Sequence, residues 1–142
     1  MQTPHLPLAT PDPWYIAERL GLTIHDQHFN DARGYAYGPH DVFLCKTLDW
    51  YGRRCTLFHE VVHVAFGHVG HQDPITELHV RYTVARDLIP WPNLMHVARP
   101  GPAAAIARDL DVTPAVLRDR IDAATPTELR ELRKARRRHK AA

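Results

Sequence analysis

Residues 57–66 read LFHEVVHVAF, a run in which apolar side chains surround two histidines and one glutamate. His59 and His63 are four residues apart, so on a helix their imidazoles lie on one face and can converge on one metal ion. Zinc suits two neutral imidazoles plus a carboxylate and leaves one coordination position open for water. The metal makes that water acidic, and the adjacent Glu60 can take its proton as the water attacks a peptide carbonyl. The pattern therefore predicts a catalytic zinc site with Glu60 as the general base.

A plainer explanation of this pattern is coincidence in a chain that has 11 histidines. His59, Glu60 and His63 would then be core residues, each with a hydrogen-bond partner, because buried polar groups need one. The HExxH spacing arises by chance on the order of a few times per hundred chains of this composition, which favours the metal site.

A third metal ligand has to come from another segment. His68 and His71 lie close in sequence but outside the His-x-x-Gly-x-x-His spacing that would extend the motif. Glu77 is the predicted ligand, because an unpaired carboxylate would be unfavourable on its apolar helix face. The apolar residues of that face are Val80, Val84 and Leu88. The alternative is a glutamate of the first helical turn that is stabilised by the helix dipole.

Start and stop signals on either side of this stretch predict the remaining elements. Asp12 as N-cap, Pro13 at the first helical position and Gly21 past the end define a first helix. The other expected elements are strands at 22–29, 34–37 and 41–47, helices at 50–67 and 74–89, a proline-rich linker, and short helices at 103–110, 114–123 and 126–137. Residues 38–40 read as a hairpin turn. The expected apolar face of the helix at 74–89 comprises Ile75, Leu78, Tyr82, Ala85 and Ile89.

The sequence resembles the ImmA/IrrE-type metallopeptidases, which occur beside phage and mobile-element repressors. The matching stretches are Ala17-Glu18-Arg19-Leu20-Gly21, the HExxH helix through Gly67-His68, Glu77-Leu78-His79-Val80, and Ala85-Arg86-Asp87-Leu88-Ile89-Pro90. The resemblance covers about residues 13–121, with Val80 and Arg81 departing from the usual small residue and Asn or Asp.

The resemblance implies an α+β, zincin-like fold in which an N-terminal helix, a small antiparallel sheet, the HExxH helix and a ligand helix form one domain, residues 1–98. It implies zinc bound by His59, His63 and Glu77, and catalysis by Glu60. The implied activity is a zinc endopeptidase that cleaves a helix-turn-helix transcriptional repressor in the bacterial cytoplasm. The competing hypothesis is a regulatory protein that binds a repressor or DNA without cutting it; the intact Glu60 favours the enzyme.

The second predicted domain, residues 99–142, has the spacing of a helix-turn-helix. Ala107 would lie at the close crossing of two helices, Val112 and Leu117 would join them, and Asp111 stands where the turn usually has glycine. After residue 126 the chain has 7 basic against 2 acidic residues, whereas residues 1–126 have 11 against 14. A basic tail of this kind attracts DNA phosphates.

The second helix of this unit argues against sequence-specific DNA reading. Its Arg118 and Arg120 are offset by Asp119 and Asp122, and it has no Asn, Gln or Lys to contact base edges. We therefore favour a packing role for this unit and expect at most weak, non-specific DNA binding through the tail.

Composition bounds the remaining possibilities. The chain has 142 residues, 44% of them hydrophobic, which is enough for a compact domain with a core. No apolar run approaches the roughly 20 residues that span a bilayer, and the N-terminus does not read as a signal peptide. Cys45 and Cys55 read as small core residues in a reduced compartment, so we expect a cytoplasmic protein without membrane association. Tyr35 and Tyr37 are candidates for lining a cleft or stabilising an oxyanion.

Overall fold

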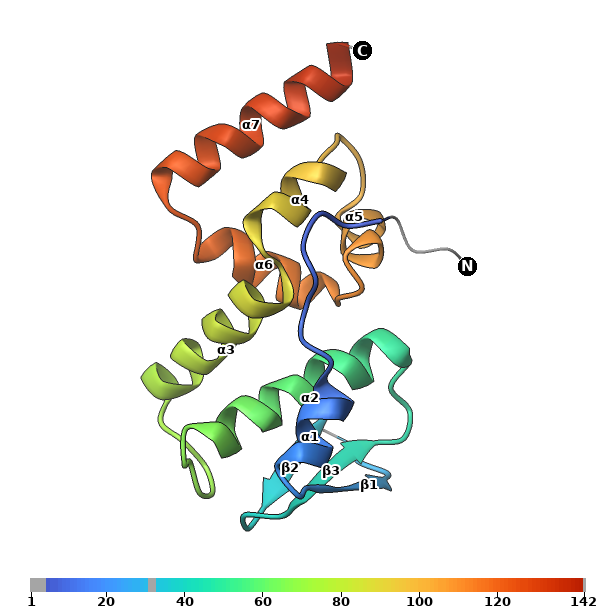
Figure 1. Cartoon of the computed structure of the whole chain (residues 1–142), viewed down its shortest axis with the longest axis vertical. Coiled ribbons are helices and arrows are strands. Elements are labelled where there is room, and N and C mark those ends of the chain that lie inside the picture. The colour runs from blue at the N-terminus through green and yellow to red at the C-terminus, as the bar shows by residue number, and fades with distance from the viewer. Residues whose placement is uncertain (1–4, 31–32, 142) are drawn as a thin grey trace. The chain divides into compact units, whose positions relative to one another are not determined.

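The computed structural model describes residues 5–30 and 33–141, which divide into two compact units (Figure 1). One unit comprises residues 11–84 and contains the HExxH helix. The other comprises residues 85–141 together with residues 5–10. Residues 85–98, which the sequence assigned to the first domain, thus lie with the C-terminal helices. The described residues form an α+β structure, as predicted.

The first unit follows the predicted order of elements. These are α1 (Pro13–Arg19), β1 (Thr23–Gln27), β2 (Gly34–Tyr37), β3 (Asp41–Cys45), α2 (Trp50–Ala65) and the start of α3 (Pro74–Leu88). The predicted cap at Asp12 is confirmed, because its side chain accepts hydrogen bonds from the backbone N–H groups of Trp14 and Tyr15. Asp49 caps α2 in the same way and accepts one from Gly52 at 2.8 Å. These carboxylates satisfy N–H groups that the first helical turns leave free.

The sheet is mixed, so the prediction of an antiparallel sheet was wrong for one strand pair. The strand order is β1-β3-β2; β2 and β3 are antiparallel, whereas β1 and β3 are parallel. The turn at residues 38–40 joins β2 and β3 as predicted, but it places β3 between the other two strands. The chain reverses direction twice between β1 and β3, so these neighbours run the same way. The central position suits β3 because its Val42 and Leu44 are completely buried.

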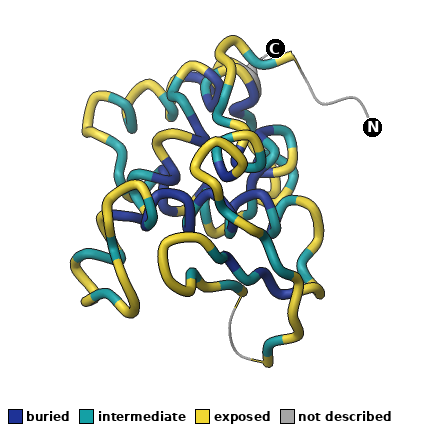
Figure 2. The backbone as a smooth tube through the Cα atoms, turned by 60° about the horizontal axis from the view of Figure 1, so that its bottom comes forward, coloured by how far each residue is buried: buried dark blue, intermediate teal, exposed yellow. Residues whose placement is uncertain are grey.

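Helix α2 packs on one face of this sheet, against β2 and β3. Its Leu57, Phe58 and Val61 are buried, as the apolar run predicted. A Cβ at Gly34 would lie 2.7 Å from the backbone carbonyl oxygen of Phe43 on β3 and 2.8 Å from Thr56 Cγ2 on α2, so only glycine fits between the neighbouring strand and the helix. Figure 2 shows buried residues in the interior and exposed residues along most connecting loops. Cys45 and Cys55 are both buried, as expected.

Helix α3 buries only part of the predicted face. Ile75 and Leu78, expected in that face, are 83% and 39% exposed. Ala85 and Ile89, the residue just after the helix, are buried as predicted, together with Val80, Val84 and Leu88. Both sets have helical spacing, so periodicity did not distinguish them. The buried set includes the three residues that share a face with Glu77.

The second unit contains a helix that the sequence analysis missed. The helices of this unit are α4 (Trp91–Val97), α5 (Ala103–Asp109), α6 (Pro114–Asp122) and α7 (Pro126–Ala141), and α4 is the one that was missed. The prolines at 90 and 92 were interpreted as a linker, but both lie at the start of α4, where a helix does not need their missing N–H groups. None of the helices in residues 5–30 and 33–141 is long and apolar enough to cross a membrane.

Polar contacts tie residues 85–98 to the rest of this unit. Arg120 donates from Nε to the carbonyl of Ile89 at 2.8 Å, and its guanidinium lies 4.9 Å from the centre of the Trp91 ring. The buried Asn93 side chain donates to the carbonyl of Leu8 at 2.9 Å and accepts from its N–H at 2.8 Å. These contacts explain why the segment belongs to the C-terminal unit.

The C-terminal helices follow their predicted signals. Ala107, Val112 and Leu117 are all buried, and Asp111 takes the left-handed conformation, φ 60°, that glycine usually supplies. Helix α7 begins with a capping box: Glu128 N–H donates to Thr125 Oγ1 at 3.1 Å, and Thr125 N–H donates to Glu128 Oε1 at 3.0 Å.

Candidate metal centre

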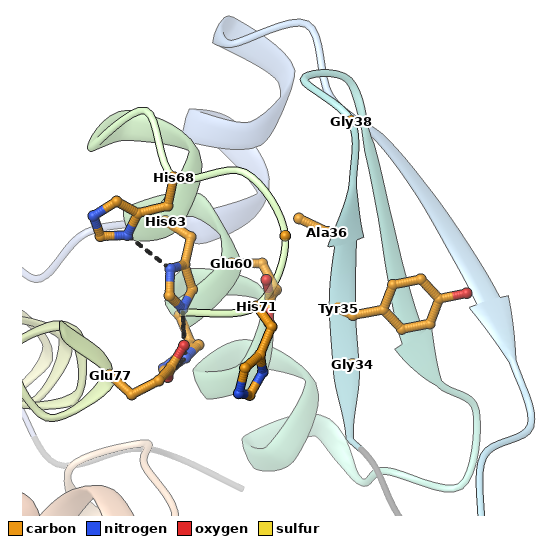
Figure 3. Close-up of a pocket in the computed structure, with 11 residues that line it drawn as sticks. Gly34, Tyr35, Ala36, Gly38, Glu60, His63, His68, His71 and Glu77 are labelled. Atoms are coloured by element: carbon orange, nitrogen blue, oxygen red, sulfur yellow. Dashed lines mark hydrogen bonds and ion pairs between the residues drawn. The ribbon is translucent and has the colours of Figure 1, made fainter. Parts of the chain in front are cut away.

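The three predicted ligands lie together in the structure, and Figure 3 shows two of them, His63 and Glu77. His59 and His63 project from the last two turns of α2, and Glu77 projects from the first turn of α3. One ligand atom from each residue lies within 4.8 Å of the others. The Nε2 atom of His63 is 2.8 Å from Glu77 Oε1 and 3.1 Å from Nε2 of His59. The Nε2 atom of His59 is 3.2 Å from Glu77 Oε2.

The segment between the two helices is what brings Glu77 to the histidines. Helix α2 ends at Ala65, and Gly67, at a φ of 73°, reverses the chain two residues later. Helix α3 begins just after Asp73, whose Oδ1 accepts from the N–H of Thr76 at 2.8 Å and whose backbone carbonyl accepts from the N–H of Glu77 at 2.9 Å. These two signals place Glu77 in the first turn of α3, across from the end of α2.

The donor set fits a divalent metal ion. Burial lowers the pKa of His59, and the neighbouring His63 lowers it further. Burial also lowers the pKa of His63, although the charge of Glu77 acts in the opposite direction. Both imidazoles are therefore neutral at neutral pH, the form that binds metals. Two imidazole nitrogens and one carboxylate around a common point match a catalytic zinc site, which keeps a further position open.

Glu60 lies in the same cavity but is not one of the three converging ligands. Burial, and then the charge of Glu77, raise the pKa of Glu60 to about 7, while a hydrogen bond with the backbone of Ala36 opposes the rise. A carboxylate with a pKa near 7 can both accept and release a proton at neutral pH. The HExxH pattern predicts that Glu60 accepts a proton, and a raised pKa is compatible with that prediction.

Strand β2 lines one wall of the cavity, whose volume is about 570 Å³. Its lining residues beyond the ligands and Glu60 are Gly34, Tyr35, Ala36, Gly38, His68, Gly70 and His71. The Tyr35 ring points away from the histidines (Figure 3) and stacks on Phe43 with 5.0 Å between the ring centres. Tyr37 lies on the same side of the strand and is 72% exposed. Neither phenol therefore faces the cluster as an oxyanion donor.

Two histidines that were named from the sequence without a role, His68 and His71, line the same cavity. His68 lies outside the longer histidine motif, but its Nδ1 is 3.0 Å from Nδ1 of His63. Gly67 is the sequence signal that could have predicted this contact of His68 with His63. A glycine after a helix end turns the next residue back toward the last turn of the helix.

The burial of Glu60 predicts a specific pH dependence of stability in the metal-free protein. Because folding raises this pKa from 4.5 to about 7, the folded state is favoured at low pH, and this contribution is lost as the pH rises through that interval. Glu60→Gln cannot ionise. The variant should therefore become more stable relative to the wild type as the pH rises. The difference between their free energies of unfolding should grow by roughly 3 kcal/mol between about pH 4.5 and pH 7 and stay constant above pH 7. Urea denaturation in the presence of a chelator measures this difference, and a pH-independent difference would contradict it.

Comparison with protein-family models, curated proteins and solved structures finds no match for this chain.

Proposed function

We propose that this chain is a zinc-dependent endopeptidase with a zincin-like catalytic unit, in which His59, His63 and Glu77 hold the metal. The observation that carries the proposal is the convergence of these three donors in the cavity that also contains the Glu60 carboxylate. Two imidazoles, a carboxylate ligand and a separate buried carboxylate are the parts that metal-assisted hydrolysis needs. A purely structural polar cluster has no need of the second carboxylate.

Glu60 is the proton acceptor and donor in this proposal. When zinc is bound, it supplies the Lewis acidity that polarises a carbonyl and acidifies water. Glu60 takes a proton at its carboxylate as water attacks the carbonyl carbon, and it passes the proton to the leaving amine. In the metal-free site, burial and the charge of Glu77 raise its pKa to about 7.

The position of β2 supports a peptide substrate. This strand is at the edge of the sheet and lines the cavity. The N–H of Cys45 donates to the carbonyl of Arg33 at 2.7 Å, so Arg33 directs its backbone groups toward β3. In an antiparallel pair every second residue does so, and the backbone N–H and C=O groups of Gly34 and Ala36 therefore face away from β3. An extended peptide can add to such an edge through main-chain hydrogen bonds. The contact between Ala36 and Glu60 puts that edge beside the general base.

The proposed substrate, a helix-turn-helix transcriptional repressor, rests on the sequence resemblance, and it would place the protein in the bacterial cytoplasm. Incubation of the zinc-loaded chain with such a repressor, followed by mass spectrometry, tests this assignment. We expect cleavage at one site, which stops when a chelator removes the metal and resumes when zinc is restored. An intact repressor would exclude this substrate, and cleavage that persists with chelator would exclude the metal mechanism.

The alternative function, binding a repressor or DNA without cleavage, is favoured by the basic surface of α7. Arg133, Arg136 and Arg137 are exposed and line a shallow hollow of about 340 Å³ together with Pro100. Neutralising phosphates with such side chains releases counterions, which gives binding that is independent of sequence and sensitive to salt.

We expect duplex DNA to bind weakly through this surface. Replacing the three arginines by glutamine should weaken binding equally on unrelated sequences and reduce the slope of log K against log salt by up to about 3. Fluorescence anisotropy at several salt concentrations measures both quantities, and peptidase activity should not change. Tight binding to one sequence at physiological salt would instead support the DNA-binding alternative.

A further inference from the structure

We propose that His68 is a positioning residue for the metal centre: its hydrogen bond to His63 fixes the tautomer and orientation in which Nε2 of His63 faces the metal. The inference rests on the proposed metal centre and adds a residue to it. Its basis is the 3.0 Å contact between Nδ1 of His63 and Nδ1 of His68, drawn as a dashed line in Figure 3.

The backbone places His68 against His63 independently of the side chains. Helix α2 ends with the N–H of His68 donating to the carbonyl of His63 at 2.9 Å and the N–H of Gly67 donating to the carbonyl of Val64 at 3.0 Å. This pair of bonds, with Gly67 at a φ of 73°, is a Schellman motif. In such a cap the residue after the glycine contacts the third residue from the helix end. Here those two residues are His68 and His63, and a hydrogen bond takes the place of the usual apolar contact.

The hydrogen bond selects one tautomer of each ring. The Nε2 atom of His63 faces Glu77 and His59, so it needs a free lone pair to bind a metal, and the ring proton is then on Nδ1. That proton is donated to Nδ1 of His68, whose own proton is on Nε2. A ligating histidine whose other N–H is held in this way is better oriented and more basic.

His68 is not itself a fourth ligand of the same ion in this arrangement. Its Nδ1 meets the side of the His63 ring opposite the nitrogen that faces Glu77 (Figure 3). Phe66 lies edge-on beside His68, with 5.7 Å between the ring centres, and the His68 side chain is half-buried. His68 is thus confined by the helix cap on one side and by an aromatic ring on the other.

Zinc affinity, measured by competition with a chromophoric chelator, tests this role with a matched pair of amides. In His68→Asn the amide oxygen takes the position of Nδ1 and can still accept the proton of His63, whereas in His68→Gln it is displaced by one methylene group. We expect His68→Gln and His68→Ala to bind zinc about 10- to 100-fold more weakly than the wild type. His68→Asn should bind close to the wild type. The control is His96→Ala, which removes an exposed histidine from α4.

The visible spectrum of the cobalt-substituted protein provides a second readout. All His68 variants should retain the wild-type spectrum at saturating cobalt, because the ligands themselves are unchanged. Wild-type zinc affinity in His68→Gln would overturn the inference and leave the metal centre intact. Equal losses in the Asn and Gln variants would overturn the hydrogen-bond mechanism, and an altered cobalt spectrum would show that His68 is a ligand instead. A wild-type protein that binds no metal would overturn the proposed function as well.

Discussion

Glu60→Gln is expected to abolish peptide hydrolysis while the protein keeps its full zinc content. Glutamine has nearly the same shape as glutamate but cannot accept the proton of the attacking water, and a positioned general base contributes about 10²- to 10⁴-fold to rate. Glu60 is not one of the three converging ligand residues, so its loss should not release the metal. The rate of repressor cleavage and the zinc content of the same sample are the two measurements.

The contrast between these two readouts is what makes the experiment specific. A variant that loses both activity and zinc would show that Glu60 holds the metal, and one that cleaves at the wild-type rate would exclude it as the general base. Thermal denaturation of the variant serves as the folding control. The chain should remain folded, because replacing this buried carboxylate with an amide removes a charge that burial disfavours.

His63→Ala is expected to reduce the zinc content from about one ion per chain to nearly none. His63 contacts both other ligand residues, at 2.8 Å and 3.1 Å, and it is the most buried of the three, so its removal breaks the site at its centre. A catalytic zinc site has only three protein ligands, and the two that remain do not retain the ion at low concentrations. Inductively coupled plasma mass spectrometry of purified samples measures the content.

The other histidines of the chain provide the control for this loss. His96→Ala, on a different unit of the structure, should retain the full zinc content. Retention of full zinc by His63→Ala would refute the assignment of this residue as a ligand and direct attention to the remaining histidines.

Local signals in the sequence predicted the site and most of the fold. The caps at Asp12, Asp49 and Thr125 act within one helical turn, so a few residues define each helix start. The spacing of His59 and His63 determines that they share a face. Glu77 was predicted because a carboxylate on an apolar stripe requires a partner, and the structure places it beside both imidazoles.

What the sequence did not predict depends on contacts between distant segments. The residues of β1 do not determine whether its neighbour in the sheet is parallel or antiparallel. That relation depends on β3 taking the position next to β1. Helix α4 was not predicted because its prolines were interpreted as part of a linker. Its place in the C-terminal unit depends on the hydrogen bond from Arg120 to the carbonyl of Ile89, about 30 residues earlier in the chain. The role of His68 depends on the helix cap, which turns a residue outside the motif back onto His63.

X-ray absorption at the zinc edge of the purified protein tests whether His59, His63 and Glu77 bind the metal, because it reports the atoms bound to the ion without needing a substrate. We expect two imidazole nitrogens and carboxylate or water oxygens at about 2.0–2.2 Å, and no sulfur. In His63→Ala reconstituted with zinc at high concentration, the imidazole contribution should fall to one. A sulfur contribution at about 2.3 Å in the wild type would implicate Cys45 or Cys55 and contradict the assignment, as would a coordination sphere without histidine.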